Sequence, residues 1–239
     1  MLEYYSKDVV VLIEIRGIGV SGKKASGIAY KLEKHDNQYH QTKYLDKDQE
    51  KKRLHEILKR AKAQVNHFYQ EAKQIDSDTA DIFASHELLL TDVELISYIE
   101  RLVDYGYDLN SALIRTREDM KTHFLSMKSE TFRSKVDDIN DVFDRLINIE
   151  LGIALEYTFP KQPFILVCND ILPSIIYRIP RENLKGIITR FGSNCSHGVI
   201  LARTKNIPVI IRIKNNIDII HNNDKLIMNG ESGTVFLID

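Results

Sequence analysis

The chain has 239 residues, of which 43% are hydrophobic and 28% are charged, enough for one large domain or two modest ones. Its formal net charge of −1 provides no overall basic field, which argues against nucleic acid and anionic membranes as partners. Cys168 and Cys195 fit neither a disulfide framework nor a zinc site. The amino terminus has no leader pattern, and the apolar run at residues 9–13 is too short to cross a bilayer. We therefore expect a cytoplasmic protein.

Strand-like sequence opens the chain. Residues 9–15 are apolar and rich in β-branched side chains, and residues 25–32 form a second such run after a glycine-rich turn. Because an isolated pair of strands is marginal in water, these two need partners from the carboxy-terminal half.

The middle of the chain is predicted to be helical. From about residue 46 to residue 151 there is no proline, and Gly106 is the only glycine. Apolar residues recur at spacings of three and four, and Asp92 is placed to cap a helix. The charge run Lys51–Arg53 is interpreted as a solvated helix face. The pattern predicts an all-α bundle of four or five helices, near residues 54–75, 82–90, 95–103, 110–124 and 136–147.

Strand-like sequence returns after Gly152. We predict an α/β domain formed by both chain ends, residues 1–33 and 152–239, with an all-α helical-bundle domain, residues 34–151, inserted between them. The carboxy-terminal half is predicted to contain strands at residues 163–168, 184–189, 208–213, 224–229 and 234–238, and helices at residues 175–179 and 198–204.

The segment Gly192–Arg203 carries the clearest chemical signal. It places His197 behind a short polar loop and at the start of an apolar, helix-like run. At the first turn of a helix, backbone N–H groups and the helix dipole favour an anion, so His197 is well placed to carry a phosphoryl group on an imidazole nitrogen. The same Ser-His pair is also an ordinary capping pair, and the loop alone does not decide between the two.

Several segments resemble one family in chain order. They are Gly19–Ala29, Ala84–Leu95, Asp137–Leu146, Ser196–His197, Ala202–Arg203 and Ile207–Pro208. Together they make the chain similar, over essentially its whole length, to the amino-terminal half of Enzyme I, the phosphoenolpyruvate (PEP)–protein phosphotransferase of the bacterial sugar phosphotransferase system. In that family the first segment belongs to a hairpin, and the second carries the surface for the carrier protein HPr.

The resemblance implies a swivelling phosphohistidine domain and an HPr-binding helical domain. His197 would receive a phosphoryl group from PEP and pass it to HPr, with Ser196 beside it as the second catalytic-loop residue. PEP and Mg²⁺ would be bound by a separate carboxy-terminal domain that is missing here, so we expect no cofactor or metal in this chain. We also expect a monomer, because family members dimerise through that missing half. The implied partner-binding residues are His86, Leu88, Leu89, Asp92, Glu94 and Arg203.

The chain departs from the family pattern around the histidine. The family loop has paired glycines, an arginine and Thr-Ser-His-Thr, whereas this loop has Asn194, Cys195 and Gly198 in place of the arginine and the two threonines. Leu172 stands where the family has a hydroxyl residue that hydrogen-bonds the imidazole. These differences remove groups that would orient the ring or bind phosphoryl oxygens. The alternative function is therefore a diverged, non-catalytic module that docks HPr or has a regulatory role.

Overall fold

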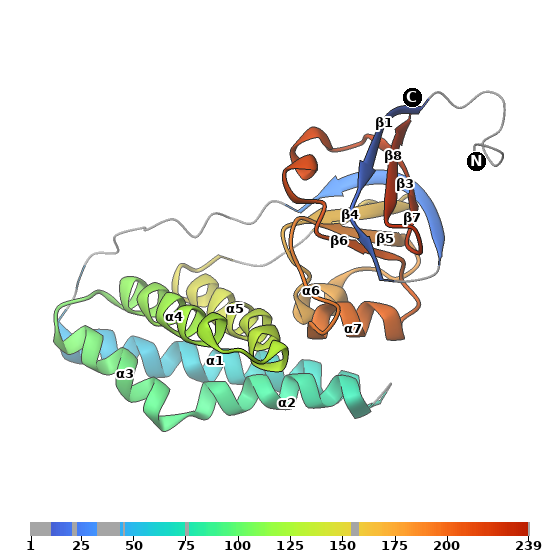
Figure 1. The fold of residues 1–239 in the computed structure, drawn as a ribbon. Coiled ribbons are helices and arrows are strands. Elements are labelled where there is room, and N and C mark those ends of the chain that lie inside the picture. The colour runs from blue at the N-terminus through green and yellow to red at the C-terminus, as the bar shows by residue number, and fades with distance from the viewer. Residues whose placement is uncertain are drawn as a thin grey trace. The chain divides into compact units, whose positions relative to one another are not determined.

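The computed structural model describes residues 11–20, 23–32, 44, 46–74, 77–153 and 158–238, and the chain divides into two compact units (Figure 1). The sheet unit comprises Met1–Lys34, Tyr157–Ile171 and Arg178–Asp239, and the helical unit comprises His35–Glu156 and Leu172–Tyr177. The strands are β1 (Val11–Arg16), β2 (Ile18–Gly19), β3 (Lys24–Lys31), β4 (Phe164–Cys168), β5 (Leu184–Thr189), β6 (Val209–Ile211), β7 (Lys225–Asn229) and β8 (Thr234–Ile238). The helices are α1 (Lys47–Lys73), α2 (Ser77–Thr91), α3 (Val93–Asp104), α4 (Leu109–Ser126), α5 (Glu130–Glu150), α6 (Pro173–Arg178), α7 (His197–Thr204) and the 3₁₀ helix η1 (Lys214–Ile219).

The sheet unit is built on one mixed sheet. In the described ranges its eight strands follow the order β1-β8-β7-β3-β4-β5-β6-β2. The run β3-β4-β5-β6 is parallel, whereas β1, β8, β7 and β3 pair antiparallel. Every residue of β4 is buried, as expected for a parallel strand covered on both faces.

The two edges of this sheet are joined by a single residue. Gly17 separates β1 from β2, although these strands lie at opposite ends of the strand order. Because consecutive Cα atoms are only about 3.8 Å apart, the sheet must curl until its edges nearly meet. The Gly17 N–H donates to the Gly233 carbonyl at 2.8 Å, and a Cβ at Gly19 would overlap the Gly230 carbonyl oxygen. Glycine is therefore required where the edges approach.

The amino-terminal strands do find their partners in the carboxy-terminal half, as predicted. β1 pairs with β8 and β3 pairs with β4 and β7. β1 and β3 are not neighbours in the sheet, because the Gly17–Gly19 crossing carries the chain to β6 before β3 begins. The part of the predicted first strand that precedes Val11 lies outside the described residues.

The helical unit contains the predicted bundle. The apolar stripe of α1, including Leu54, Leu58 and Val65, is buried in one core with residues from α2 to α5. Asp92 caps α3 as expected, since its carboxylate accepts from the N–H groups of Glu94 at 2.8 Å and Leu95 at 3.1 Å. The predicted end of the first helix at residue 75 lies outside the described residues. Within the described ranges, no helix has both the length and the apolar content to span a bilayer.

Helix α6 belongs to the helical unit, although it lies between β4 and β5 in the chain. The Asp141 carboxylate on α5 accepts hydrogen bonds from the Ser174 N–H at 2.9 Å and the Ser174 hydroxyl at 2.6 Å. The Tyr177 ring packs edge-on against Phe83 of α2 at 5.1 Å. The sequence prediction placed residues 172–177 in the α/β domain, whereas these contacts group them with the helices.

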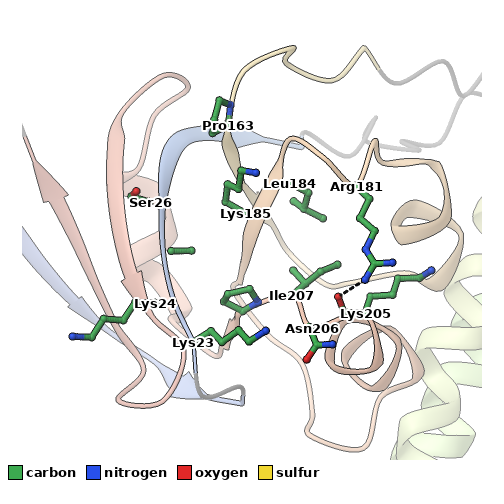
Figure 2. Close-up of a pocket in the computed structure, with 12 residues that line it drawn as sticks. Lys23, Lys24, Ser26, Pro163, Arg181, Leu184, Lys185, Lys205, Asn206 and Ile207 are labelled. Atoms are coloured by element: carbon green, nitrogen blue, oxygen red, sulfur yellow. Dashed lines mark hydrogen bonds between the residues drawn. The ribbon is translucent and has the colours of Figure 1, made fainter.

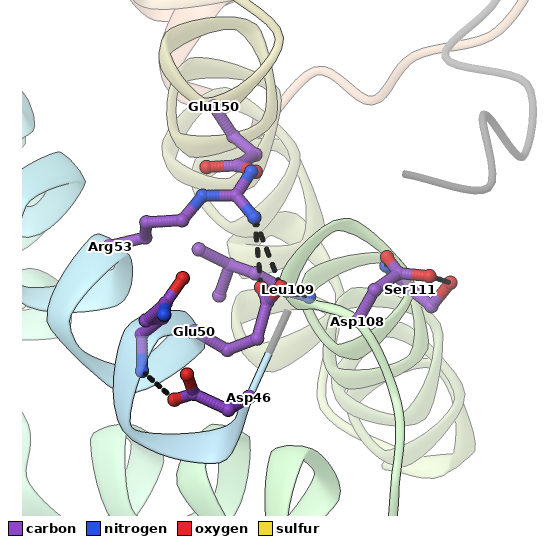
Figure 3. A network of polar contacts seen from close by, with 8 residues as sticks. Asp46, Glu50, Arg53, Asp108, Leu109, Ser111 and Glu150 are labelled. Carbon is purple, nitrogen blue, oxygen red and sulfur yellow. Dashed lines mark hydrogen bonds and ion pairs between the residues drawn. The ribbon is translucent and has the colours of Figure 1, made fainter. Parts of the chain in front are cut away.

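A buried ion network joins the ends of three helices (Figure 3). Glu50 of α1 is fully buried, and its carboxylate accepts from Arg53 Nη1 at 3.0 Å and from the Leu109 N–H, at the start of α4, at 3.0 Å. The Arg53 guanidinium also pairs with Glu150 at the end of α5. The interpretation of Lys51–Arg53 as a solvated face is therefore wrong for Arg53, because most of its side chain is buried where it pairs with Glu50, one turn earlier in α1, and with Glu150, distant in sequence.

We expect Glu50→Ala to lower the unfolding free energy of the helical unit by about 3–5 kcal/mol, because it removes one partner from a buried charge network. The Leu109 N–H also loses its acceptor. Urea unfolding followed by circular dichroism at 222 nm measures the change. Glu56→Ala, at an exposed position of the same helix, is the control and should stay within about 0.5 kcal/mol of the parent. Equal losses in both variants would contradict the network's role.

Candidate functional site

The loop after β5 presents His197 at the first position of α7. Ser196 is the N-cap, with a buried side chain whose hydroxyl oxygen accepts from the Val199 N–H at 3.4 Å. The His197 side chain is half-buried. A capping serine ahead of an apolar run is the local signal that starts this helix. The imidazole therefore lies where the helix dipole favours negative charge.

Hydrogen bonds from neighbouring segments brace this loop. The Phe191 N–H donates to the Asn169 carbonyl at 3.0 Å, and Arg212 Nε donates to the Gly192 carbonyl at 2.8 Å. Arg190 pairs with Asp218 through both carboxylate oxygens. The hydrogen bond from Arg190 lowers the pKa of the Asp218 carboxyl below its usual value. The loop is thus held from the ends of three other segments, which fixes the position from which α7 begins.

Gly198 is required by a close approach of two backbone segments. A Cβ at this position would overlap the Ile171 carbonyl oxygen and lie 2.9 Å from Ile171 Cγ2. The turn after β4 therefore passes directly against the first turn of α7. The family pattern has a threonine at this position. In this chain a threonine side chain would force one of the two backbone segments to move, so glycine is the residue that fits.

The predicted partner-binding residues fall into different environments. Leu88 is 71% exposed, and Asp92 and Glu94 are exposed at the junction of α2 and α3. Leu89 is half-buried and packs against the helical core. Val93, which the sequence reasoning missed, is 74% exposed at the same junction. The signal that could have found it is its position at the start of a helix, directly after the capping Asp92.

His86, which the sequence analysis names as a partner-binding residue, lies inside the helical unit. Its side chain has no exposed surface, and its Nε2 lies 3.4 Å from Asp138 Oδ1 on α5. Phe83 packs edge-on against the ring at 5.7 Å. His86 thus contributes to the packing of α2 on α5.

Arg203 does not share the His197 site. It is exposed in the last turn of α7, about 9 Å along the helix axis from His197. It also belongs to the sheet unit, whereas the other predicted partner-binding residues belong to the helical unit.

Among the described residues there is no group of three or more His, Cys, Asp or Glu side chains arranged to hold a metal ion. The described residues around His197 therefore do not provide the ligand set of a resident Mg²⁺.

Comparison with known families decides which group the chain belongs to. Residues 16–135 match the amino-terminal domain of PEP-utilising enzymes, and residues 160–233 match their mobile domain. The chain belongs to the family of PEP-utilising enzymes. The second match contains the His197 loop.

Named relatives of this family agree with that assignment. The chain is 31% identical over 227 residues to the phosphoenolpyruvate-protein phosphotransferase of Bacillus subtilis and 28% identical over 227 residues to that of Staphylococcus carnosus. Each alignment covers 94% of this chain but only 40% of the relative. The chain thus spans well under half the length of the curated relatives it matches.

Solved structures match the fold. A solution structure of Enzyme I aligns with a TM-score of 0.69 at 22% identity, covering 93% of this chain and 92% of that one. The N-terminal domain of Enzyme I-Nitrogen aligns with a TM-score of 0.61 at 23% identity, covering 94% and 93%. The resemblance to the amino-terminal half of Enzyme I and the predicted fold class, an α/β domain plus a helical bundle, are confirmed.

We expect Gly198→Ala to destabilise the sheet unit by about 1–3 kcal/mol, because the new methyl group overlaps backbone rather than a flexible side chain. The gain in helix propensity of about 1 kcal/mol offsets only part of this. Calorimetry measures the loss, and the NMR signals of the His197 ring should shift with it. Ile200→Ala, on the exposed side of the same helix, is the control. An unchanged or raised melting temperature for Gly198→Ala would show that the approach is not tight.

Proposed function

We propose that this chain is a phosphotransfer domain that carries a phosphoryl group on His197 and exchanges it with an HPr-type phosphocarrier. The observation that carries the proposal is the placement of a half-buried histidine at the first residue of α7, in a segment that matches the mobile domain of PEP-utilising enzymes. An imidazole titrates near neutral pH and is a competent nucleophile when neutral.

The exchange needs little covalent chemistry from the protein. An imidazole nitrogen of His197 attacks the phosphorus of the phosphorylated carrier, an N–P bond forms, and the carrier's own N–P bond breaks. The carrier's imidazole leaves with the electron pair of that bond. The protein's contribution is alignment and stabilisation of the charge on the phosphoryl oxygens, to which the amino terminus of α7 is suited.

Ser196 supports this chemistry as a positioning residue. Its hydroxyl oxygen accepts from the Val199 N–H, so it sets where α7 starts. The hydrogen bonds from the loop to Asn169 and Arg212 also help to fix the position of the loop. A fixed loop reduces the entropy that the reacting groups lose when they align.

The docking surface that we propose lies at the junction of α2 and α3 and consists of Leu88, Asp92, Val93 and Glu94. Two exposed apolar side chains lie beside two exposed carboxylates. A small apolar contact flanked by acidic groups suits a transient partner with a basic, partly apolar face. The distinct exposure of Leu88 and Val93 is the main support for this surface, since most apolar residues of α2 and α3 are buried or half-buried.

PEP enters this scheme through another domain. We propose that PEP and Mg²⁺ bind to a separate carboxy-terminal domain, since the curated relatives are much longer than this chain. We also propose that the complete reaction takes place in the cytoplasm. Neither nucleic acid nor a membrane is a partner in this proposal. His197 then receives the phosphoryl group from PEP and passes it to the carrier. We propose that the present chain by itself is monomeric and does not use PEP.

A second candidate is a docking module that binds the carrier without accepting its phosphoryl group. The observation that favours it is Leu172, a buried apolar residue where the family resemblance leads us to expect a hydroxyl. Asn194 likewise cannot supply the positive charge of an arginine. In this case the α2–α3 junction would retain its role and His197 would be a helix-start residue only.

We expect label to move from ³²P-phosphorylated HPr to the chain and to be absent from His197→Ala. The label should be acid-labile and base-stable, as a phosphohistidine is. Ser196→Ala should keep the label but form it more slowly, because loss of the cap weakens the start of α7 by about 1 kcal/mol. Cys195→Ser is the matched loop control and should label as the parent does. Binding of HPr without any label would favour the docking module.

Leu88→Ser should weaken HPr binding about tenfold or more, because an exposed apolar side chain is lost from the proposed surface. Folding should be unaffected, since the side chain is 71% exposed. Isothermal titration calorimetry measures the affinity. Leu125→Ser, at a 52% exposed position of α4, is the control for loss of an exposed leucine. If both variants bound HPr equally well, the partner surface would have to lie elsewhere.

A further inference from the structure

A cleft lined by several basic residues lies on the sheet unit (Figure 2). Its volume is about 600 Å³. Five of the residues that line it are basic, namely Lys23, Lys24, Arg181, Lys185 and Lys205, and none of the lining residues in the described ranges is acidic. The chain as a whole has a formal net charge of −1, so its composition does not explain why basic residues gather in this cleft.

The cleft occupies the opposite end of the parallel strands from His197. Its walls come from the residue before β4, the first residues of β3 and β5, and the turn between α7 and β6. His197 follows the carboxyl end of β5, whereas the cleft includes Lys205 just beyond the other end of α7. The eight residues of α7 alone separate the two by about 12 Å along the helix axis. The cleft is therefore a separate site and not part of the phosphotransfer loop.

Backbone carbonyls hold two of the cations in place. Arg181 Nη2 donates to the Lys205 carbonyl at 3.0 Å, and Lys185 Nζ donates to the Glu182 carbonyl at 2.6 Å. These carbonyl oxygens orient the side chains but do not neutralise their charge. Basic residues gathered in one cleft create a positive local field, which attracts anions from solution.

Apolar side chains line the same cleft. Leu184 and Ile207 are buried, and Pro163 and Pro208 flank them. Small-molecule sites combine such apolar walls with a few convergent polar groups and have volumes of about 300–1,000 Å³. The cleft has both properties, so a bound ligand would place charged groups on the cations and an organic body on the apolar wall.

We propose that this cleft binds a small molecule that carries two or more phosphate groups. One phosphate can contact only part of a cleft lined by five basic residues, whereas linked phosphates can contact several of these residues at once. The site is independent of phosphotransfer, since none of its lining residues belongs to the loop or the helix start at His197.

NMR titration of the whole chain at low salt tests the proposal, with inorganic phosphate, pyrophosphate and ADP as probes. Pyrophosphate should bind at least about tenfold more tightly than phosphate, and the amide signals of Lys185, Asn206 and Ile207 should shift. Tighter binding of ADP than of pyrophosphate would identify the ligand as a nucleotide-like molecule that uses the apolar wall. Equal affinity of the two would identify the polyphosphate group alone as the ligand.

Paired variants separate a site from general attraction. Lys23→Gln/Lys185→Gln should lower pyrophosphate affinity at least about tenfold, whereas Lys52→Gln/Lys59→Gln, at exposed positions of α1, should leave it unchanged. Circular dichroism confirms that both variants fold. The inference is overturned if both pairs weaken binding equally, or if pyrophosphate binds no more tightly than phosphate. His197→Ala should bind pyrophosphate as the parent does, so failure of the proposed phosphotransfer leaves this test intact.

Discussion

The parallel hydrogen-bonded ladder of β4, β5 and β6 is the constraint on which the sheet unit depends. β4 and β6 are buried throughout and β5 nearly so, and their backbone groups are occupied by the ladder. Polar side chains in the middle of these strands would be buried without hydrogen-bond partners, which lowers the stability of the fold. Functional side chains are therefore confined to the strand ends. The carboxyl end of β5 leads to the His197 loop, and the amino ends of β4 and β5 form walls of the cleft lined by basic residues.

The elements that could be predicted from the sequence are those with local signals. Spacings of three and four predicted the helical bundle, and the apolar runs predicted the long strands, because periodicity depends only on neighbouring residues. The start of α7 could also be predicted, since Ser196 and His197 stand directly before an apolar helical run. By contrast, β2 is two residues long, and no periodic pattern can mark such a strand. Its pairing with β6, and the curl of the sheet that follows, depend on the close approach at Gly19.

Long-range polar contacts account for most of what the sequence could not predict. Histidine in a helix between polar residues suggests a surface position, yet His86 is buried because Asp138 lies 52 residues away in the chain and next to it in space. Helix α6 joins the helical unit because Asp141 caps it from 33 residues away. Arg53 is drawn inward by Glu150 in the same manner. Each pairing depends on how helices pack, which single-sequence patterns do not encode.

Charge is distributed between the two units in a way that separates their proposed tasks. The proposed docking surface at the α2–α3 junction has Asp92 and Glu94 beside Leu88, whereas the cleft of the sheet unit has five basic residues and no acidic one among its described lining residues. A carrier with a basic contact face is attracted to the first and repelled by the second. A polyanionic small molecule has the opposite preference. Each of the two proposed sites therefore disfavours the ligand of the other through the sign of its local charge.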